Sequence, residues 1–145
     1  MKTVFAIAAV VAIFFTLYAA PSVAETDGAD YVIVANKQLP GASINMTALK
    51  GIYLREVLNW GKSEGEIVPV DLANSNGFYQ NLFGKSYVQM QAYWLNMRIK
   101  YSMNLPVTKK DAESVKEYIA ANKNAIGFLR SSDLDDRVKV LKVVN

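Results

Sequence analysis

The stretch IVPVDLANSNGFYQNLF, residues Ile67 to Phe83, is the part of the chain that says most about its fold. It reads as a buried strand, a polar turn of Asn, Ser and Gly, and the opening of a helix near Phe78. A helix that starts directly after a strand leaves its first backbone N–H groups unpaired, and its dipole favours an anion there. The same pattern describes turns whose Asn and Ser only cap the helix, so it predicts either an anion site or a structural cap.

The first 24 residues have the organisation of a secretory signal peptide. Lys2 gives a positive start, an apolar run follows from Val4 to Ala20, and Pro21 to Ala24 ends in a small-x-small pattern. We expect cleavage after Ala24 and a periplasmic or secreted protein. The alternative is that the segment is retained as an N-terminal anchor. Residues 25–145 then form a single domain, and no later stretch is apolar enough to span a membrane.

The charge of residues 25–145 is nearly balanced. Removing Lys2 from the 16 basic side chains leaves 15 against 13 acidic ones, and they are scattered along the chain. Nucleic-acid binding proteins and polybasic membrane-binding segments concentrate basic residues on one face or in one run. The sequence therefore predicts neither a nucleic-acid partner nor an electrostatic membrane contact.

The chain contains no Cys and no His. This composition excludes disulfides, zinc sites of the Cys/His kind, and Ser-His-Asp or Cys-His catalytic relays. The local acidic cluster at Asp133, Asp135 and Asp136 lacks the Gly and the distal Glu of a calcium loop and is predicted to be a solvated turn. We expect a protein without a metal or cofactor, and not an enzyme.

The rest of the chain alternates between strand-like and helix-like patterns. Thr47 is predicted to cap a helix that ends near residues 59–61, and residues 38–46 and 103–110 are predicted to be connections. The other expected elements are a strand over 31–35, a helix from Phe78 that stops at Gly84, a helix over 87–100 capped by Ser86, a helix from Asp111 to Asn122, and strands over 125–129 and 137–144. Strands separated by helices predict an α/β fold with an open, mostly parallel sheet flanked by helices.

One predicted helix carries an aromatic and Met stripe at helical spacing. The stripe consists of Met90, Tyr93, Trp94, Met97 and Tyr101. Such a stripe is typical of a core-facing surface, and we expect these side chains to be buried.

Several segments, in this order, resemble the phosphate-binding periplasmic proteins of ABC transporters, and most closely their short single-domain relatives. The segments are VIVANK (32–37), LKGIYLREVLNW (49–60), IVPVDL (67–72), FYQNLFGKS (78–86), QMQAYW (89–94), VKEYIAANKNAIGFL (115–129) and VKVLKV (138–143). The resemblance covers nearly all of residues 25–145. It implies a single-lobe periplasmic-binding-protein-like domain.

The resemblance also implies where a ligand would bind. Relatives hold their anion at a helix N-terminus, and the matching residues are Asn74, Ser75, Asn76, Gly77 and Phe78, with first-loop contacts from Asn36 and Thr47. The family's Ser-Gly-Thr run and the Arg that follows it are absent. The basic residues nearest in sequence, Lys62 and Lys85, do not match the position of that Arg. The departure predicts weaker anion binding than in the relatives.

Two functions follow from these observations. The first is a non-enzymatic exported module that binds phosphate or a similar small anion weakly. The second is a protein-interaction or assembly component, in contact with an envelope protein or with a second copy, that keeps the fold without the ligand. Its motivation is the altered turn and an aromatic supply larger than a small core needs, consisting of Tyr53, Trp60, Tyr79, Tyr87, Tyr93, Trp94 and Tyr101.

Overall fold

A computed structural model describes residues 30–62 and 65–145 of the 145-residue chain. The predicted signal peptide lies outside these residues. The elements, in chain order, are β1 (Tyr31–Ala35), β2 (Ser43–Asn45), α1 (Met46–Tyr53), β3 (Val68–Leu72), α2 (Asn76–Phe83), α3 (Tyr87–Tyr101), β4 (Val107–Lys109), α4 (Ala112–Ala121), β5 (Ala125–Arg130), the 3₁₀ helix η1 (Ser131–Asp133) and β6 (Lys139–Val144). In the described part of the chain, no helix has the length and apolar character needed to cross a membrane.

The strands form one six-stranded sheet in the order β2-β6-β1-β5-β3-β4. The pairs β2–β6, β3–β4 and β3–β5 are parallel, whereas β1 runs antiparallel to both of its neighbours, β5 and β6. Val68 of β3 lies opposite Ala125 of β5, and Ala35 at the end of β1 lies opposite Ile126. The start of β3, the start of β5 and the end of β1 therefore share one edge of the sheet.

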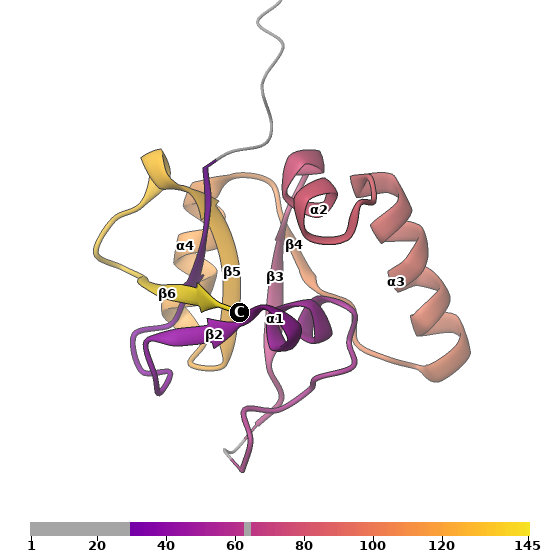
Figure 1. The fold of residues 1–145 in the computed structure, drawn as a ribbon, viewed down its shortest axis with the longest axis horizontal. Coiled ribbons are helices and arrows are strands. Elements are labelled where there is room, and N and C mark those ends of the chain that lie inside the picture. The colour runs from indigo at the N-terminus through magenta and orange to yellow at the C-terminus, as the bar shows by residue number, and fades with distance from the viewer. Residues whose placement is uncertain (1–29, 63–64) are drawn as a thin grey trace, which may run out of the picture.

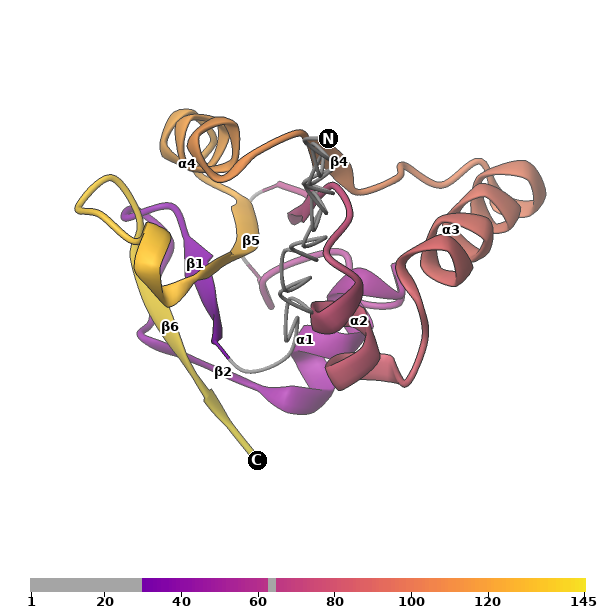
Figure 2. The same cartoon turned by 90° about the horizontal axis from the view of Figure 1, so that it is seen from above.

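Helices cover both faces of the sheet (Figures 1 and 2). The helices α1, α2 and α3 lie on one side, where an aromatic-rich core includes Tyr53, Phe78 and Phe128. The helix α4 covers the other face and packs on Val34, Val70 and other apolar residues of a second core. This arrangement confirms the predicted α/β class with an open sheet flanked by helices, in which three of the five strand pairings are parallel.

The predicted cap and end of the first helix are wrong. Asn45, not Thr47, is the N-cap of α1, because its side chain accepts a hydrogen bond of 2.6 Å from the backbone N–H of Ala48. Helix α1 ends at Tyr53, well before residues 59–61. The apolar spacing continues past that point, but Arg55 has a positive φ of 61° that no α-helix accommodates.

Helices α3 and α4 begin and end within one residue of the prediction, whereas α2 begins at Asn76, two residues before the predicted start at Phe78. Ser86 forms a capping box with Gln89 at the start of α3, and Asp111 caps α4 by accepting from Ser114 N–H at 2.8 Å. Gly84 terminates α2 in the left-handed conformation. The strands β2 and β4 were not predicted, because three residues are too few to display an alternating pattern.

The helix α3 buries only part of its predicted stripe. Met90 and Trp94 are buried, Tyr93 and Met97 are half-buried, and Tyr101 is 64% exposed. Most of the aromatic supply lies in the core, where Tyr53, Tyr79, Tyr87 and Trp94 are packed together. The aromatic residues therefore give less support to an interaction surface than the sequence alone indicated.

Candidate functional site

The turn between β3 and α2 exposes two amide side chains at a helix N-terminus. Asn74 is exposed and has a left-handed φ of 62°, and Asn76, the first residue of α2, is exposed as well. Asn76 Oδ1 accepts a hydrogen bond of 2.9 Å from the backbone N–H of Tyr87, which ties the turn to the start of α3. Both amide side chains are therefore at the surface of the predicted site, and that of Asn76 also anchors the turn to α3.

Ser75 does not cap the helix that it precedes. Its buried hydroxyl donates to the carbonyl oxygen of Leu72. Among the four α-helices of the described residues, α2 lacks a side-chain cap bond, whereas Asn45, Ser86 and Asp111 cap the other three. The cap side chain therefore does not occupy the first turn of α2.

The other two residues of the predicted set have their side chains, where they have one, in the core. Phe78 is 5% exposed and its ring stacks on Phe128 with centroids 3.6 Å apart. Gly77 is buried and has no side chain to offer. Any ligand contact made by these two residues would come from the backbone.

A buried carboxylate lies directly below the turn. Asp71 Oδ1 accepts from the Tyr79 hydroxyl at 2.5 Å, and Oδ2 accepts from Tyr87 Oη at 2.9 Å and from Thr108 Oγ1 at 3.0 Å. Burial raises the pKa of Asp71 above its usual value, and the three hydroxyl donors partly oppose that rise. Asp71 therefore joins β3 to α2, α3 and β4.

The structure does not bring the two first-loop residues to this turn. Asn36 follows β1 at the opposite edge of the sheet, where its buried Nδ2 donates to the carbonyls of Ile119 and Ala120 at 2.8 and 3.1 Å. These bonds cap the C-terminal end of α4. Thr47 is exposed in the first turn of α1.

Basic residues distant in sequence lie at the same edge of the sheet as the turn. Leu72 pairs with Lys109 of β4, and the Ala73 N–H donates to the Lys109 carbonyl at 2.9 Å. Lys109 and the next residue, Lys110, therefore lie beside the start of the turn. The Lys109 ammonium lies 4.6 Å from the centroid of the Tyr118 ring, toward α4. Sequence proximity to the turn could not identify these residues, because the β3–β4 pairing that places them spans about 37 positions of chain.

Arg130 also ends its strand at this edge. Its guanidinium carbon lies 5.9 Å from the centroid of the Tyr31 ring, and that ring lies 5.7 Å from the ring of Phe78 in α2. Arg130 therefore lies near the start of α2, separated from Phe78 by the ring of Tyr31. No Arg follows the turn closely in the sequence.

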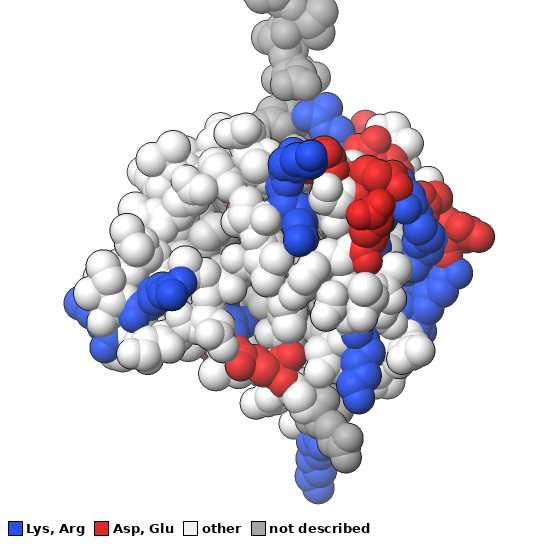
Figure 3. Space-filling view, turned by 180° about the vertical axis from the view of Figure 1, so that it is seen from behind, with Lys and Arg blue, Asp and Glu red and all other residues white. Residues whose placement is uncertain are grey.

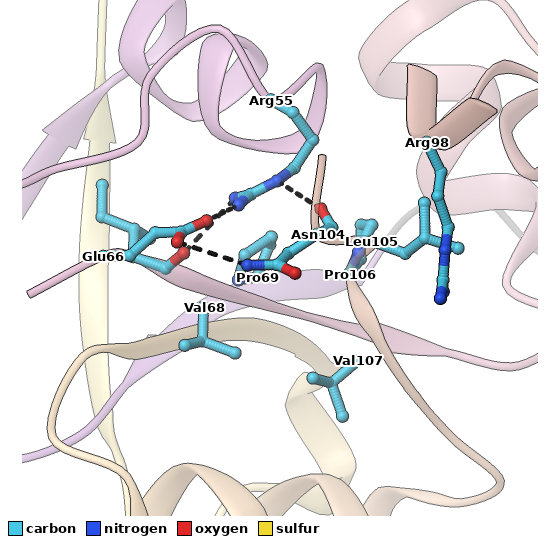
Figure 4. A pocket seen from close by; sticks show the side chains of 10 residues that line it. Arg55, Glu66, Val68, Pro69, Arg98, Asn104, Leu105, Pro106 and Val107 are labelled. Carbon is cyan, nitrogen blue, oxygen red and sulfur yellow. Dashed lines mark hydrogen bonds and ion pairs between the residues drawn. The ribbon is translucent and has the colours of Figure 1, made fainter. Parts of the chain in front are cut away.

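A groove of about 510 Å³ lies at the opposite end of β3, between the end of α1 and the α3–β4 connection (Figure 4). Arg55 is 2% exposed there, and its guanidinium donates to the Asn104 carbonyl at 2.9 Å, to the Ile67 carbonyl at 3.3 Å and to the Glu66 carboxylate. These bonds use the Arg55 side chain to join three chain segments. Arg98 lies at the rim of the groove.

One residue of the acidic cluster that follows β5, Asp135, is paired with cationic side chains of the protein. Asp135 forms ion pairs with Lys116 at 2.8 Å and with Arg137 at 2.6 Å, and these contacts hold the pKa of Asp135 well below its usual range. No group of three metal-binding side chains occurs among the described residues. Asp135 therefore joins the segment before β6 to α4.

The fold is similar to that of phosphate-binding proteins of known structure. An ABC-type phosphate transport receptor from Vibrio cholerae matches with a TM-score of 0.56 and 19% identity, over 79% of this chain and 46% of that one. PstS from Borrelia burgdorferi matches with a TM-score of 0.56 and 16% identity, over 79% of this chain and 47% of that one. The chain spans less than half the length of these proteins, and at this identity the likeness shows the fold.

One curated protein matches part of the sequence. The endospore coat-associated protein YutH of Bacillus subtilis (strain 168) is 32% identical over 76 residues, which are 52% of this chain and 22% of that protein. No family model matches the chain.

Proposed function

We propose that this chain is an exported, non-enzymatic module with a substrate-binding-protein-like fold that takes phosphate or a similar small anion at the N-terminus of α2. The observation that carries the proposal is the turn itself: Ser75 turns its hydroxyl away from the helix, and Asn74 and Asn76 are exposed beside the first turn. Helix N-termini favour anions through their N–H groups and dipole.

The fold is consistent with a phosphate-like ligand. The similar solved structures include an ABC-type phosphate transport receptor and a PstS protein. Export rests on the signal-peptide pattern of residues 1–24, with residues 25–145 as the domain.

The side chains around the turn support weak binding. An Arg that contacts an anion through charge-assisted hydrogen bonds contributes about 1.5 to 3 kcal/mol. Lys109 lies over the ring of Tyr118 and Arg130 lies over the ring of Tyr31, and the Arg that follows the turn in the resembling family is absent from this sequence. We expect dissociation constants of about 1 mM or weaker for phosphate.

Isothermal titration with phosphate, sulfate and acetate tests the proposal. The Asn74→Asp variant places a negative charge at the start of α2, which the helix dipole favours, so folding should be kept while anion binding is lost. Gln80→Glu is the matched control, because it adds the same charge to an exposed position one turn further along α2. The anion site is contradicted if the unsubstituted protein shows neither heat nor thermal shift at millimolar anion concentrations. Equal binding by both variants also contradicts it.

An assembly component is the second candidate, and one observation favours it. Among the described residues, large apolar side chains that are at least half exposed gather on α3, where Val88, Leu95, Ile99 and Tyr101 are 71, 55, 74 and 64% exposed. By helical spacing Val88, Leu95 and Ile99 share one face of α3, and soluble monomers rarely expose a large contiguous apolar patch. Light scattering and affinity capture from the native cell envelope test this candidate, and a strict monomer without a partner contradicts it.

A further inference from the structure

We propose that the outer face of α3 pairs antiparallel with α3 of a second copy of this chain. The face consists of Val88, Ala92, Leu95 and Ile99, which we call the α3 seam. This pairing is independent of anion binding at α2.

The α3 seam has the spacing of a coiled-coil interface. Its members follow one another at intervals of four, three and four residues, which is the alternation of a and d positions in a heptad. At about 100° per residue, the seam is centred roughly 140° around the helix from the buried Tyr87, Met90 and Trp94. Helix α3 therefore presents one apolar face to its own core and a second one outward.

The surroundings leave the seam accessible to another helix. Figures 1 and 2 show α3 at the side of the molecule, with its outer face turned away from the other elements. In Figure 3, charged atoms gather on the side that carries α4 and the segment before β6, whereas the side that carries α3 is mostly white, with a blue cluster at its lower end. The residues that flank the seam, Gln89, Gln91, Asn96 and Arg98, are exposed and carry one charge between them.

Side-chain sizes favour a second copy in the antiparallel orientation. With the two-fold axis between Ala92 and Leu95, each small Ala92 faces a Leu95 of the other copy and each Val88 faces an Ile99. In a parallel pair, Ala92 would face Ala92 and leave a gap, which costs packing energy. The seam is therefore complementary to itself in one orientation.

Charge favours the same orientation. The charged side chains of α3 are Arg98 and Lys100, both in its last turn, and no acidic residue lies in the helix. An antiparallel pair places these cations at opposite ends, where Arg98 adjoins Gln91 of the other copy. A parallel pair would bring four cations together at one end. A seam of two heptads buries less than a standard interface of roughly 1,600 Å², so the dimer should be reversible and concentration-dependent.

Sedimentation of the purified protein across a concentration series tests the pairing. The unsubstituted chain should move from monomer to dimer, and Leu95→Glu should raise the dimer dissociation constant at least tenfold without loss of folding, because Leu95 is already 55% exposed. Val140→Glu is the matched control, since Val140 is 48% exposed on β6, and it should leave the dimer intact. A protein that is monomeric at every concentration overturns the proposal, as does a monomer that binds phosphatidylglycerol vesicles through Leu95.

Cysteine cross-linking tests the orientation, and the absence of native Cys makes every disulfide attributable. A mixture of Val88→Cys and Ile99→Cys chains should form a cross-linked heterodimer under mild oxidation, because the two positions face each other. Val88→Cys alone should not, because its two copies lie about 16 Å apart along the helix axis and a disulfide needs Cα atoms within about 7 Å. Efficient cross-linking of Val88→Cys with itself, or none in the mixture, overturns the antiparallel pair.

Discussion

The two ends of β3 each bury a charged side chain and satisfy it with different partners. Next to the start of β3, Arg55 donates to two backbone carbonyls and to the carboxylate of Glu66, whose side chain is 41% exposed. Near the end of β3, Asp71 accepts from three hydroxyl groups, and no ion pair is recorded for it among the described residues. The cation Arg55 is thus bound by acceptors that include one carboxylate, whereas the carboxyl group of Asp71 is bound by neutral hydroxyl donors.

The two ends differ in the groups that satisfy the buried charge. Two of the three acceptors of Arg55 are backbone carbonyls, which do not ionise. The Asp71 carboxyl has a raised pKa because burial disfavours its charged form. Since Asp71 immediately precedes Leu72 and the candidate turn, the raised pKa makes the stability of this end of the sheet depend on pH.

Removing the Arg55 side chain should have the largest effect. Arg55→Ala leaves the buried Ile67 carbonyl without its donor, which costs about 1 to 3 kcal/mol, and it removes the bond to the Asn104 carbonyl and the pair with the half-exposed Glu66, which contribute about 1 kcal/mol each. Chemical denaturation measures the loss. Arg98→Ala, at the exposed rim of the same groove, is the control and should change stability by about 0.5 kcal/mol or less. Similar losses for the two variants would show that the hydrogen bonds of Arg55 do not stabilise the fold.

Removing one hydroxyl from the Asp71 site should have the next largest effect. Tyr79→Phe deletes a buried donor to a carboxylate, and hydrogen bonds to charged groups contribute about 1.5 to 3 kcal/mol. Tyr53→Phe is the matched control, because the equally buried Tyr53 hydroxyl donates to a neutral carbonyl, that of Val70, at 2.9 Å. Denaturation at neutral pH should show the larger loss for Tyr79→Phe; the reverse order would mean that Asp71 is neutral there.

The sequence predicted the elements better than it predicted these two joints. Strand and helix patterns in segments of five or more residues located β1, β3, β5, β6 and the helices α2, α3 and α4, because burial of one or both faces imposes a period on the sequence. The strand order and the reversal of β1 depend on contacts between distant segments, which local periodicity does not record. Arg55 lies in a stretch that resembles a continuing helix, and its positive φ was not visible from the residue type.

The strand–turn–helix pattern located the turn that joins β3 to α2, where Asn74 and Asn76 are exposed. Ligand binding at this turn stays a prediction. Asp71, at a buried position within a strand, was the signal for a buried polar network, but its donors Tyr79, Tyr87 and Thr108 come from three other elements. Asn36 follows β1, which runs antiparallel to β5 while β3 runs parallel to β5, so the end of β1 lies away from the turn; the sequence pattern does not record these strand directions.

Replacing the carboxyl of Asp71 tests the pH dependence of its end of the sheet. The folded-state pKa of Asp71 lies above the ordinary value of 3.8, so its protonated form contributes stability that is fully present below pH 3.8 and is lost as pH rises through the folded-state pKa. Asp71→Asn cannot ionise and should lack this loss. At low pH the two proteins should differ by about 1 kcal/mol or less, and the balance should then shift toward Asp71→Asn with rising pH. Parallel stability curves for the two proteins from pH 3 to 8 would contradict the assignment.

The smallest effect is expected where water can replace the lost donor of Asp71. Thr108→Val removes a donor to Asp71 Oδ2 at 3.0 Å, but Thr108 is an exposed residue, so a water molecule can take the place of its hydroxyl. Tyr87→Phe removes a donor to the same oxygen at 2.9 Å from a buried residue that is 8% exposed. Denaturation should give a loss in unfolding free energy of about 0.5 kcal/mol for Thr108→Val and a loss at least twice as large for Tyr87→Phe.

Because hydroxyl donors favour the ionised carboxyl, each variant should also raise the pKa of Asp71 further, which NMR titration of its carboxyl carbon measures. Equal losses from the two variants would mean that solvent does not reach Asp71 from the β4 side, and the carboxylate would then be as enclosed as Arg55 at the other end of the strand.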